Sequence, residues 1–111
     1  MKVQFEDYDR ISVVRLSGDF TADDVDHFRR PIGERLAGQT RDFVLEMEET
    51  GFVDSAALEA LLWLQDAAAE RLGQIRLVGV HENVRTILDI TRLSNQFECH
   101  AQTTDAIRSL R

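Results

Sequence analysis

Segments with strand-like patterning alternate with segments of helical periodicity along this chain, and that order restricts the fold more than any other feature. Two strands come first, joined by a short turn at Asp9 and Arg10. Each later helical segment follows a strand, as in sheets whose parallel strands are connected by crossover helices. The predicted strands are residues 3–8, 11–17, 42–47, 75–80 and 97–99. The predicted helices run from the Thr21 cap to Gly38, and over residues 55–72, 83–91 and 104–110.

These elements predict a single α/β domain over residues 1–111, because no repeat, low-complexity tract or Pro/Gly-rich linker divides the chain. We expect a mixed sheet of four to five strands with helices packed mostly on one face. Phe43, Leu45 and Met47 share one side of the segment 42–47, which predicts a strand buried mainly on that side. Pro31 falls inside the first helix and is expected to bend it.

The charge balance excludes several classes of partner. The chain has 13 Lys and Arg against 20 Asp and Glu, a formal net charge of −7 at pH 7. Nucleic acid and anionic lipid both attract clustered cations, so we expect neither as a partner. Cys99 is the single cysteine and cannot form an internal disulfide, and residues 1–10 lack the apolar run of a signal peptide. These features predict a cytoplasmic protein with no direct membrane binding.

The sequence offers little for metal, cofactor or catalytic chemistry. His27, His81 and His100 fall in three separate segments, without a second His or Cys at ligand spacing. None of the six glycines belongs to a phosphate-binding loop motif. Cys99 lies in a short apolar segment and is typical of a buried, unreactive thiol. We therefore predict no metal site, no cofactor and no catalytic residue.

The helix predicted over residues 55–72 is apolar on more than one side. Its expected core stripe is Leu58, Leu61, Leu62, Gln65, Ala69 and Leu72. At about 100° per residue, the opposite side has three small residues around one tryptophan, namely Ala56, Ala60, Trp63 and Ala67. An exposed apolar strip of this kind is typical of a surface that binds a protein partner, unless another element of the fold covers Trp63.

Asp54 and Ser55 stand at the start of this helix. Either side chain can accept a hydrogen bond from an early backbone N–H and cap the helix, which by itself accounts for the pair. A serine at this position is also well placed to be phosphorylated, because free N–H groups and the helix dipole tolerate about −1.5 to −2 added charges. The residues alone are compatible with both interpretations.

Five segments are similar, in order and spacing, to the motifs of one known family. They are residues 13–19 (VVRLSGD), 43–47 (FVLEM), 52–55 (FVDS), 75–80 (IRLVGV) and 84–93 (VRTILDITRL). On these segments the chain resembles the STAS-domain family, whose best-known members are bacterial anti-sigma factor antagonists. The resemblance extends over nearly the whole chain.

The resemblance implies a regulatory switch without catalysis. The signature serine, here Ser55, would be phosphorylated by a partner that is both an anti-sigma factor and a serine kinase. The unmodified form would bind that partner, the phosphorylated form would release it, and a phosphatase would reset the switch. The residues expected to contact the partner are Gly18, Asp19, Phe20, Thr21, Asp54, Ser55, Ala56, Ala57, Glu59, Ala60, Trp63 and Ala67.

The chain departs from the family pattern at three of these positions. Ala57 stands where the family usually has Gly, Ala56 replaces a common Ser or Thr, and Thr21 replaces an Asp that often helps to engage the kinase. These departures favour a second hypothesis, a constitutive subunit that docks on a membrane transporter or a signalling scaffold without phosphorylation. An enzyme is the least supported hypothesis, because no nucleophile with a base can be assembled from the sequence.

Overall fold

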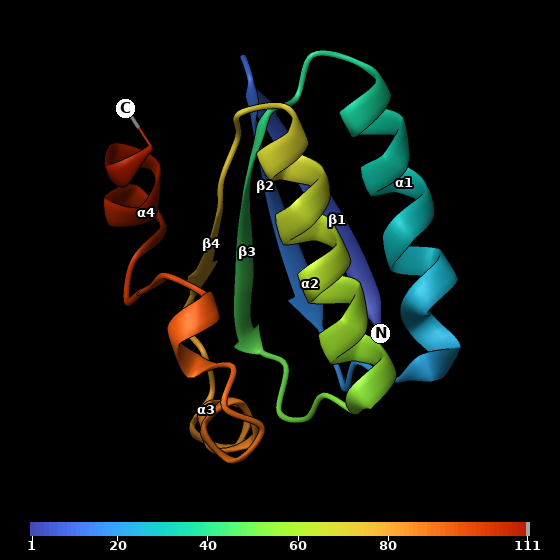
Figure 1. The fold of residues 1–111 in the computed structure, drawn as a ribbon, viewed down its shortest axis with the longest axis vertical. Coiled ribbons are helices and arrows are strands. Elements are labelled where there is room, and N and C mark those ends of the chain that lie inside the picture. The colour runs from blue at the N-terminus through green and yellow to red at the C-terminus, as the bar shows by residue number, and fades with distance from the viewer. Residues whose placement is uncertain (111) are drawn as a thin grey trace.

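The computed structural model describes residues 1–110, which form one five-stranded sheet with the strand order β1-β2-β3-β4-β5 (Figure 1). The strands are β1 (Lys2–Tyr8), β2 (Ile11–Ser17), β3 (Asp42–Glu49), β4 (Ile75–Val78) and β5 (Cys99–His100). β1 and β2 form an antiparallel hairpin, and every other neighbouring pair is parallel. The predicted α/β fold with a mixed sheet is therefore confirmed.

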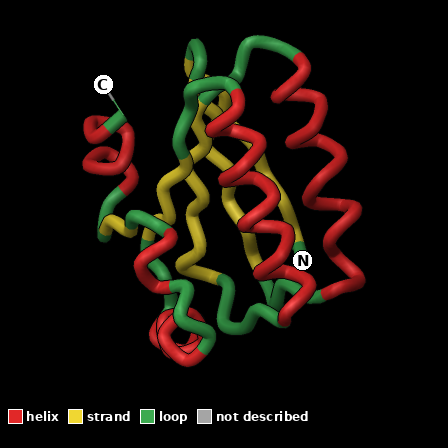
Figure 2. The backbone as a smooth tube through the Cα atoms, in the orientation of Figure 1, coloured by secondary structure: helices red, strands yellow, loops and turns green. Residues whose placement is uncertain are grey.

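Four α-helices and two short 3₁₀ turns connect or follow the strands. They are η1 (Ala22–Asp24), α1 (Val25–Ala37), α2 (Ser55–Glu70), α3 (Glu82–Ile90), η2 (Ser94–Gln96) and α4 (Thr103–Ser109). The crossovers through α1 and α2 step across the sheet in the same direction, so their common right-handedness places both helices on one face. Figures 1 and 2 show α1 and α2 side by side over the sheet. Within residues 1–110, no helix combines the length and hydropathy needed to cross a membrane.

The main core lies between the sheet and this pair of helices. Phe28, Ile32 and Leu36 recur at helical spacing along α1 and are all buried, as the sequence predicts. They pack in one cluster with alternate residues of β3, among them Leu45 and Met47.

The second face of the sheet is covered in part by α4, which corrects one prediction. Ala106 is fully buried and packs in a separate small cluster with Val13, Val44 and Val78. The expectation that β3 is buried mainly on one face is therefore wrong, since Val44 is as fully buried as its neighbours on the other side. The physical reason is that the C-terminal helix packs on the face that α1 and α2 leave open.

The buried face of α2 also differs from the predicted stripe. The buried residues are Ala57, Leu58, Ala60, Leu61, Leu64 and Ala68. This set is displaced by about one residue, or roughly 100° of rotation, because α2 packs against both the sheet and α1. Leu72 follows the helix end in a left-handed conformation (φ 61°) and is 88% exposed. The assignment of Leu72 to the core is therefore wrong.

We predict that Leu61→Ala destabilises the protein by about 3 kcal/mol, because it removes a fully buried side chain and leaves a cavity. Leu72→Ala, the matched control, should change the free energy of unfolding by less than about 0.5 kcal/mol, because its side chain is exposed. Urea denaturation followed by circular dichroism measures both. Equal losses in the two variants would contradict the rotated helix face.

Candidate functional site

The candidate site lies where the parallel strands end and the helices begin. The loops after β2 and β3 meet at this edge, and α2 starts there (Figure 1). In α/β sheets the carboxyl ends of parallel strands are the usual place for functional loops, because each connection leaves the sheet there. Residues 18–21 and 50–55 are thus neighbours although they are about thirty positions apart in the sequence.

A short parallel pairing joins these two loops. The backbone turns at Gly18, whose φ of 101° is disfavoured for residues with a Cβ. Phe20 then turns inward and is fully buried beneath the site. Its N–H donates to the Phe52 carbonyl at 2.9 Å, and its carbonyl accepts from the Asp54 N–H at 3.2 Å. These two hydrogen bonds form an isolated parallel bridge between Phe20 and Val53 and satisfy the backbone groups on both sides of Val53.

Asp54 is the residue that caps α2. Its Oδ1 accepts a hydrogen bond from the Ala57 N–H at 2.9 Å, the geometry of an N-cap side chain. Its Oδ2 accepts from the Ala22 N–H, also at 2.9 Å, in the loop that follows β2. One carboxylate therefore accepts from a free N–H in the first turn of α2 and also links this helix start to η1. Of the two capping candidates in the sequence, Asp54 is the one used.

Ser55 is the first residue of α2 and is exposed. Because Asp54 occupies the capping position, the Ser55 hydroxyl has no protein hydrogen-bond partner within residues 1–110. The first N–H groups of a helix lack intrahelical acceptors, so those of Ser55 and Ala56 are open to an added anion. Glu59, one helical turn further, is exposed on the same helix.

Thr21 and Asp24 form a second cap in the adjoining loop. The Asp24 carboxylate accepts from the Thr21 N–H at 3.0 Å and from the Thr21 hydroxyl at 3.2 Å. The Thr21 N–H bond is the main cause that lowers the pKa of Asp24 below the usual aspartate value. Thr21 thus fixes the shape of the loop that presents Asp19 beside the Gly51 backbone.

The structure brings together most of the predicted contact residues but buries three of them. Gly18, Asp19, Thr21, Asp54 and Ser55 all lie at this one edge. Phe20 and Ala57 are fully buried and Ala60 is 3% exposed, so their side chains cannot reach a partner. Their assignment as partner contacts is wrong for the side chains, because Phe20 fills the core and both alanines belong to the buried face of α2.

The predicted apolar strip on α2 is not present as an exposed surface. With Ala60 buried, Ala56, Trp63 and Ala67 are each only partly exposed. The Trp63 ring packs against the core on one side, and the Arg29 guanidinium of α1 lies 4.5 Å from its centroid on the other. The alternative that another element covers Trp63 is the correct one, because α1 packs alongside α2.

Phe52 is the aromatic residue that the site does expose, and the sequence pattern did not single it out. Its side chain is 45% exposed, three residues before Ser55. Val53, the next residue, is buried and packs in the same core as Leu58, the arrangement of a hydrophobic staple around a helix N-cap. The sequence did contain a signal for this. A hydrophobic staple needs one apolar residue before the N-cap, which Val53 supplies, so the second apolar residue, Phe52, is free to be exposed.

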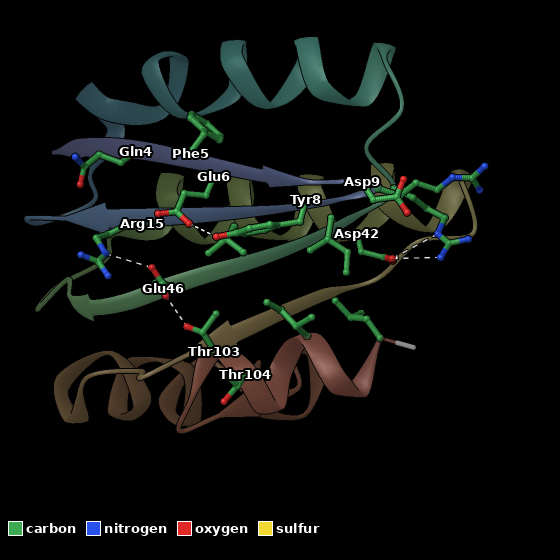
Figure 3. Close-up of a pocket in the computed structure, with 16 residues that line it drawn as sticks. Gln4, Phe5, Glu6, Tyr8, Asp9, Arg15, Asp42, Glu46, Thr103 and Thr104 are labelled. Atoms are coloured by element: carbon green, nitrogen blue, oxygen red, sulfur yellow. Dashed lines mark hydrogen bonds and ion pairs between the residues drawn. The ribbon is translucent and has the colours of Figure 1, made fainter.

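A separate hollow lies on the face of the sheet that α4 covers in part, away from α1 and α2. It measures about 1040 Å³ and is lined by the β1–β2 hairpin, β3 and α4 (Figure 3). Several of its polar groups are paired with each other: Glu46 accepts from Arg15 Nε at 3.2 Å and from the Thr103 hydroxyl, and Tyr8 donates to Glu6. Among the described residues, no loop residue from the Ser55 edge lines it. Nor do residues 1–110 contain a cluster of three or more metal-ligating side chains.

Comparison with known families places the chain. The model of the STAS domain matches residues 2–106. The chain belongs to the STAS domain family. A STAS-domain-containing protein from Pseudomonas aeruginosa is 35% identical over 65 residues. That alignment covers 59% of this chain and 64% of the relative, just under two thirds of its length.

Solved structures show the same STAS fold. A putative anti-sigma factor antagonist from Thermotoga maritima superimposes with a TM-score of 0.90 at 15% identity, over 98% of this chain and 94% of its own. The anti-sigma factor antagonist SpoIIAA in its unphosphorylated form gives 0.88 at 21% identity, over 99% and 96% of the two chains. The phosphorylated form of SpoIIAA from Bacillus gives 0.79 at 20% identity, over 99% and 100%. At these identities the likeness concerns the fold.

We predict that Asp54→Ala destabilises the domain by about 1 to 2 kcal/mol, because it removes the α2 cap and the bond to Ala22. Ser55→Ala should change stability by less than about 0.5 kcal/mol, because its hydroxyl has no protein partner within residues 1–110. Urea denaturation of the two variants gives both values. A Ser55→Ala loss as large as that of Asp54→Ala would mean that the serine shares the cap.

The lowered pKa of Asp24 predicts a pH-dependent contribution to stability. Because the folded pKa lies below the unfolded one, the contribution is fully present above the ordinary aspartate pKa of about 3.9. It is lost as the pH falls through the folded value. Asp24→Asn should therefore be less stable than the native protein at neutral pH, with a difference that shrinks near pH 2. Urea denaturation across this range tests it; a constant difference would contradict the assignment.

Proposed function

We propose that this STAS domain is a non-catalytic regulatory module that binds an anti-sigma factor with serine-kinase activity and is switched by phosphorylation of Ser55. The observation that supports this most directly is the exposed Ser55 hydroxyl on the first turn of α2, beside an Asp54 that already caps the helix. A kinase can reach such a hydroxyl without opening the fold. A phosphatase would return the protein to its binding form.

A phosphate on Ser55 is compatible with the folded domain. It would lie at the positive end of the α2 dipole, near the N–H groups of Ser55 and Ala56. Asp54 keeps its two hydrogen bonds, so the added group does not have to replace the cap. The modified protein is therefore expected to keep its structure and to change only its surface.

Release of the partner follows from charge and hydration. Phosphorylation adds about −1.5 to −2 charges. The group would be placed between Asp54 and the exposed Glu59, and closing a contact over it would require removing its water. A penalty of about 3 kcal/mol weakens binding by roughly two orders of magnitude, enough for a switch.

A second candidate is constitutive docking on a membrane transporter or a signalling scaffold. The observation that favours it is Thr21, which stands where family members often have an Asp that engages the kinase. Its hydroxyl donates to Asp24 and supports the loop instead of facing outward alone. In this alternative the same edge of the domain binds its partner, and Ser55 is never modified.

We predict that kinase-type anti-sigma factors of the source organism include one that phosphorylates the purified protein once, at Ser55. The assay incubates the two proteins with ATP and reads the intact mass, followed by peptide mapping. Ser55→Ala should remain unmodified, and Ser109→Ala, another exposed serine, should be modified as the native protein is. Ser55→Asp should bind the same kinase at least about tenfold more weakly.

Two results would overturn parts of this proposal. Absence of phosphate on Ser55 with every such kinase would remove the switch. Equal binding of native protein and Ser55→Asp to the partner would favour constitutive docking, because added negative charge would then have no effect on the contact.

A further inference from the structure

We infer that Phe52 is the anchor by which this edge of the domain holds its partner, and that the partner presents a basic surface around an apolar pocket. The inference rests on the proposed function in one respect, namely that a protein binds at this edge. It does not require Ser55 to be phosphorylated.

The Phe52 ring is not part of the buried core. Along this extended segment successive side chains point to opposite sides, and Val53 takes the inward position. Val53 and Leu58 complete the apolar contact at the start of α2. Phe52 is left 45% exposed three residues before Ser55, and a large aromatic side chain exposed at such an edge is typical of a contact with a protein partner.

The backbone that carries Phe52 is held in place before any partner binds. Its carbonyl accepts from the Phe20 N–H, and the Asp54 N–H two residues later donates to the Phe20 carbonyl. Asp54 is in turn fixed by its bonds to Ala57 and Ala22. An aromatic side chain on a fixed backbone has only two side-chain torsions to order on binding, and aromatic residues are frequent among those that dominate the binding energy of interfaces.

The surroundings of Phe52 are acidic. Residues 16–26 and 42–70, which include both loops, contain no Lys, Arg or His. The exposed carboxylates of these segments include Asp19, Asp23, Glu48, Glu49 and Glu59. A partner with Lys and Arg around its pocket complements this charge and excludes competitors of the wrong sign.

The cations that border this edge do not neutralise it. Arg15 is paired with Glu46, and the guanidinium of Arg29 stacks on Trp63. Lys2 lies opposite Ser17 in the β1–β2 register, at the margin of the acidic segments. The described residues form no salt bridge with Asp19, Asp23, Glu48, Glu49 or Glu59, so these exposed carboxylates keep their charge available to a partner.

The same charge argues against other occupants. A symmetric contact with a second copy would place this acidic edge against itself, which is unfavourable. Nucleic acid and anionic lipid would also be repelled. A basic protein surface is the remaining class that fits both the ring and its acidic rim.

Site-specific photocrosslinking tests the inference while the partner is still unidentified. Phe52 is replaced by p-benzoylphenylalanine in the full chain, expressed in the source organism and irradiated. Leu72 and Ile90, which are 88% and 76% exposed elsewhere on the surface, receive the same probe as matched controls. We expect a discrete adduct from position 52 alone, and the crosslinked peptide of the partner should lie in a region rich in Lys and Arg.

The partner identified by crosslinking is then purified, and its affinity for the native domain and for each variant is measured. Phe52→Ala should weaken it at least about tenfold, whereas Leu72→Ala and Ile90→Ala should change it less than about twofold. Raising the salt concentration should weaken binding of the native protein, because the acidic rim is screened. Phe52→Ala should still unfold in one cooperative urea transition, so that its weaker binding reports the lost contact and not a lost fold.

Several results would overturn the inference. They are no adduct at position 52, equal affinity of Phe52→Ala, or an acidic crosslinked peptide. Different results would contradict the proposed phosphorylation switch. If the crosslinked protein is not a kinase, or binds Ser55→Asp as it binds the native chain, the proposed phosphorylation is wrong while the Phe52 anchor stands.

Discussion

The candidate site depends on the two hydrogen bonds that the Asp54 carboxylate accepts. Its two oxygens accept from N–H groups of two different segments, Ala57 in α2 and Ala22 in η1. An N-cap normally stabilises one helix, but here the same group also fixes the loop after β2 against the start of α2. These two bonds therefore fix both loops of the site relative to each other. Ser55, the neighbouring serine, does not have to cap the helix.

Because Asp54 caps the helix and Ser55 does not, the proposed phosphorylation site can lie in a packed domain. Modification of a buried or hydrogen-bonded hydroxyl would compete with folding, because an unpaired buried group is costly. Ser55 avoids this conflict by standing one position after the cap, at the end of a helix that tolerates negative charge. The same logic applies to Phe52 and Val53, of which one completes the core and the other faces outward.

The sequence was a good guide to the elements and a poor guide to the orientation of α2. Hydropathy favoured the large leucines and placed Leu72 in the core and Ala60 outside, whereas the structure does the reverse. The error arises because periodicity defines a face only relative to one neighbour, and α2 has two, the sheet and α1. Trp63, expected as the exposed aromatic, is covered by Arg29 for the same reason.

By itself the sequence determined the α/β class, the order of strands and helices, the family, and the position of Asp54 and Ser55 at a helix start. These follow from local patterns and short motifs, which act over a few residues. Only the tertiary structure decided that Asp54 caps and Ser55 does not, that β3 is covered on both faces, and that Phe52 is the exposed ring. Each of these depends on segments far apart in the chain, since burial is set by what packs against a residue and not by the residue alone.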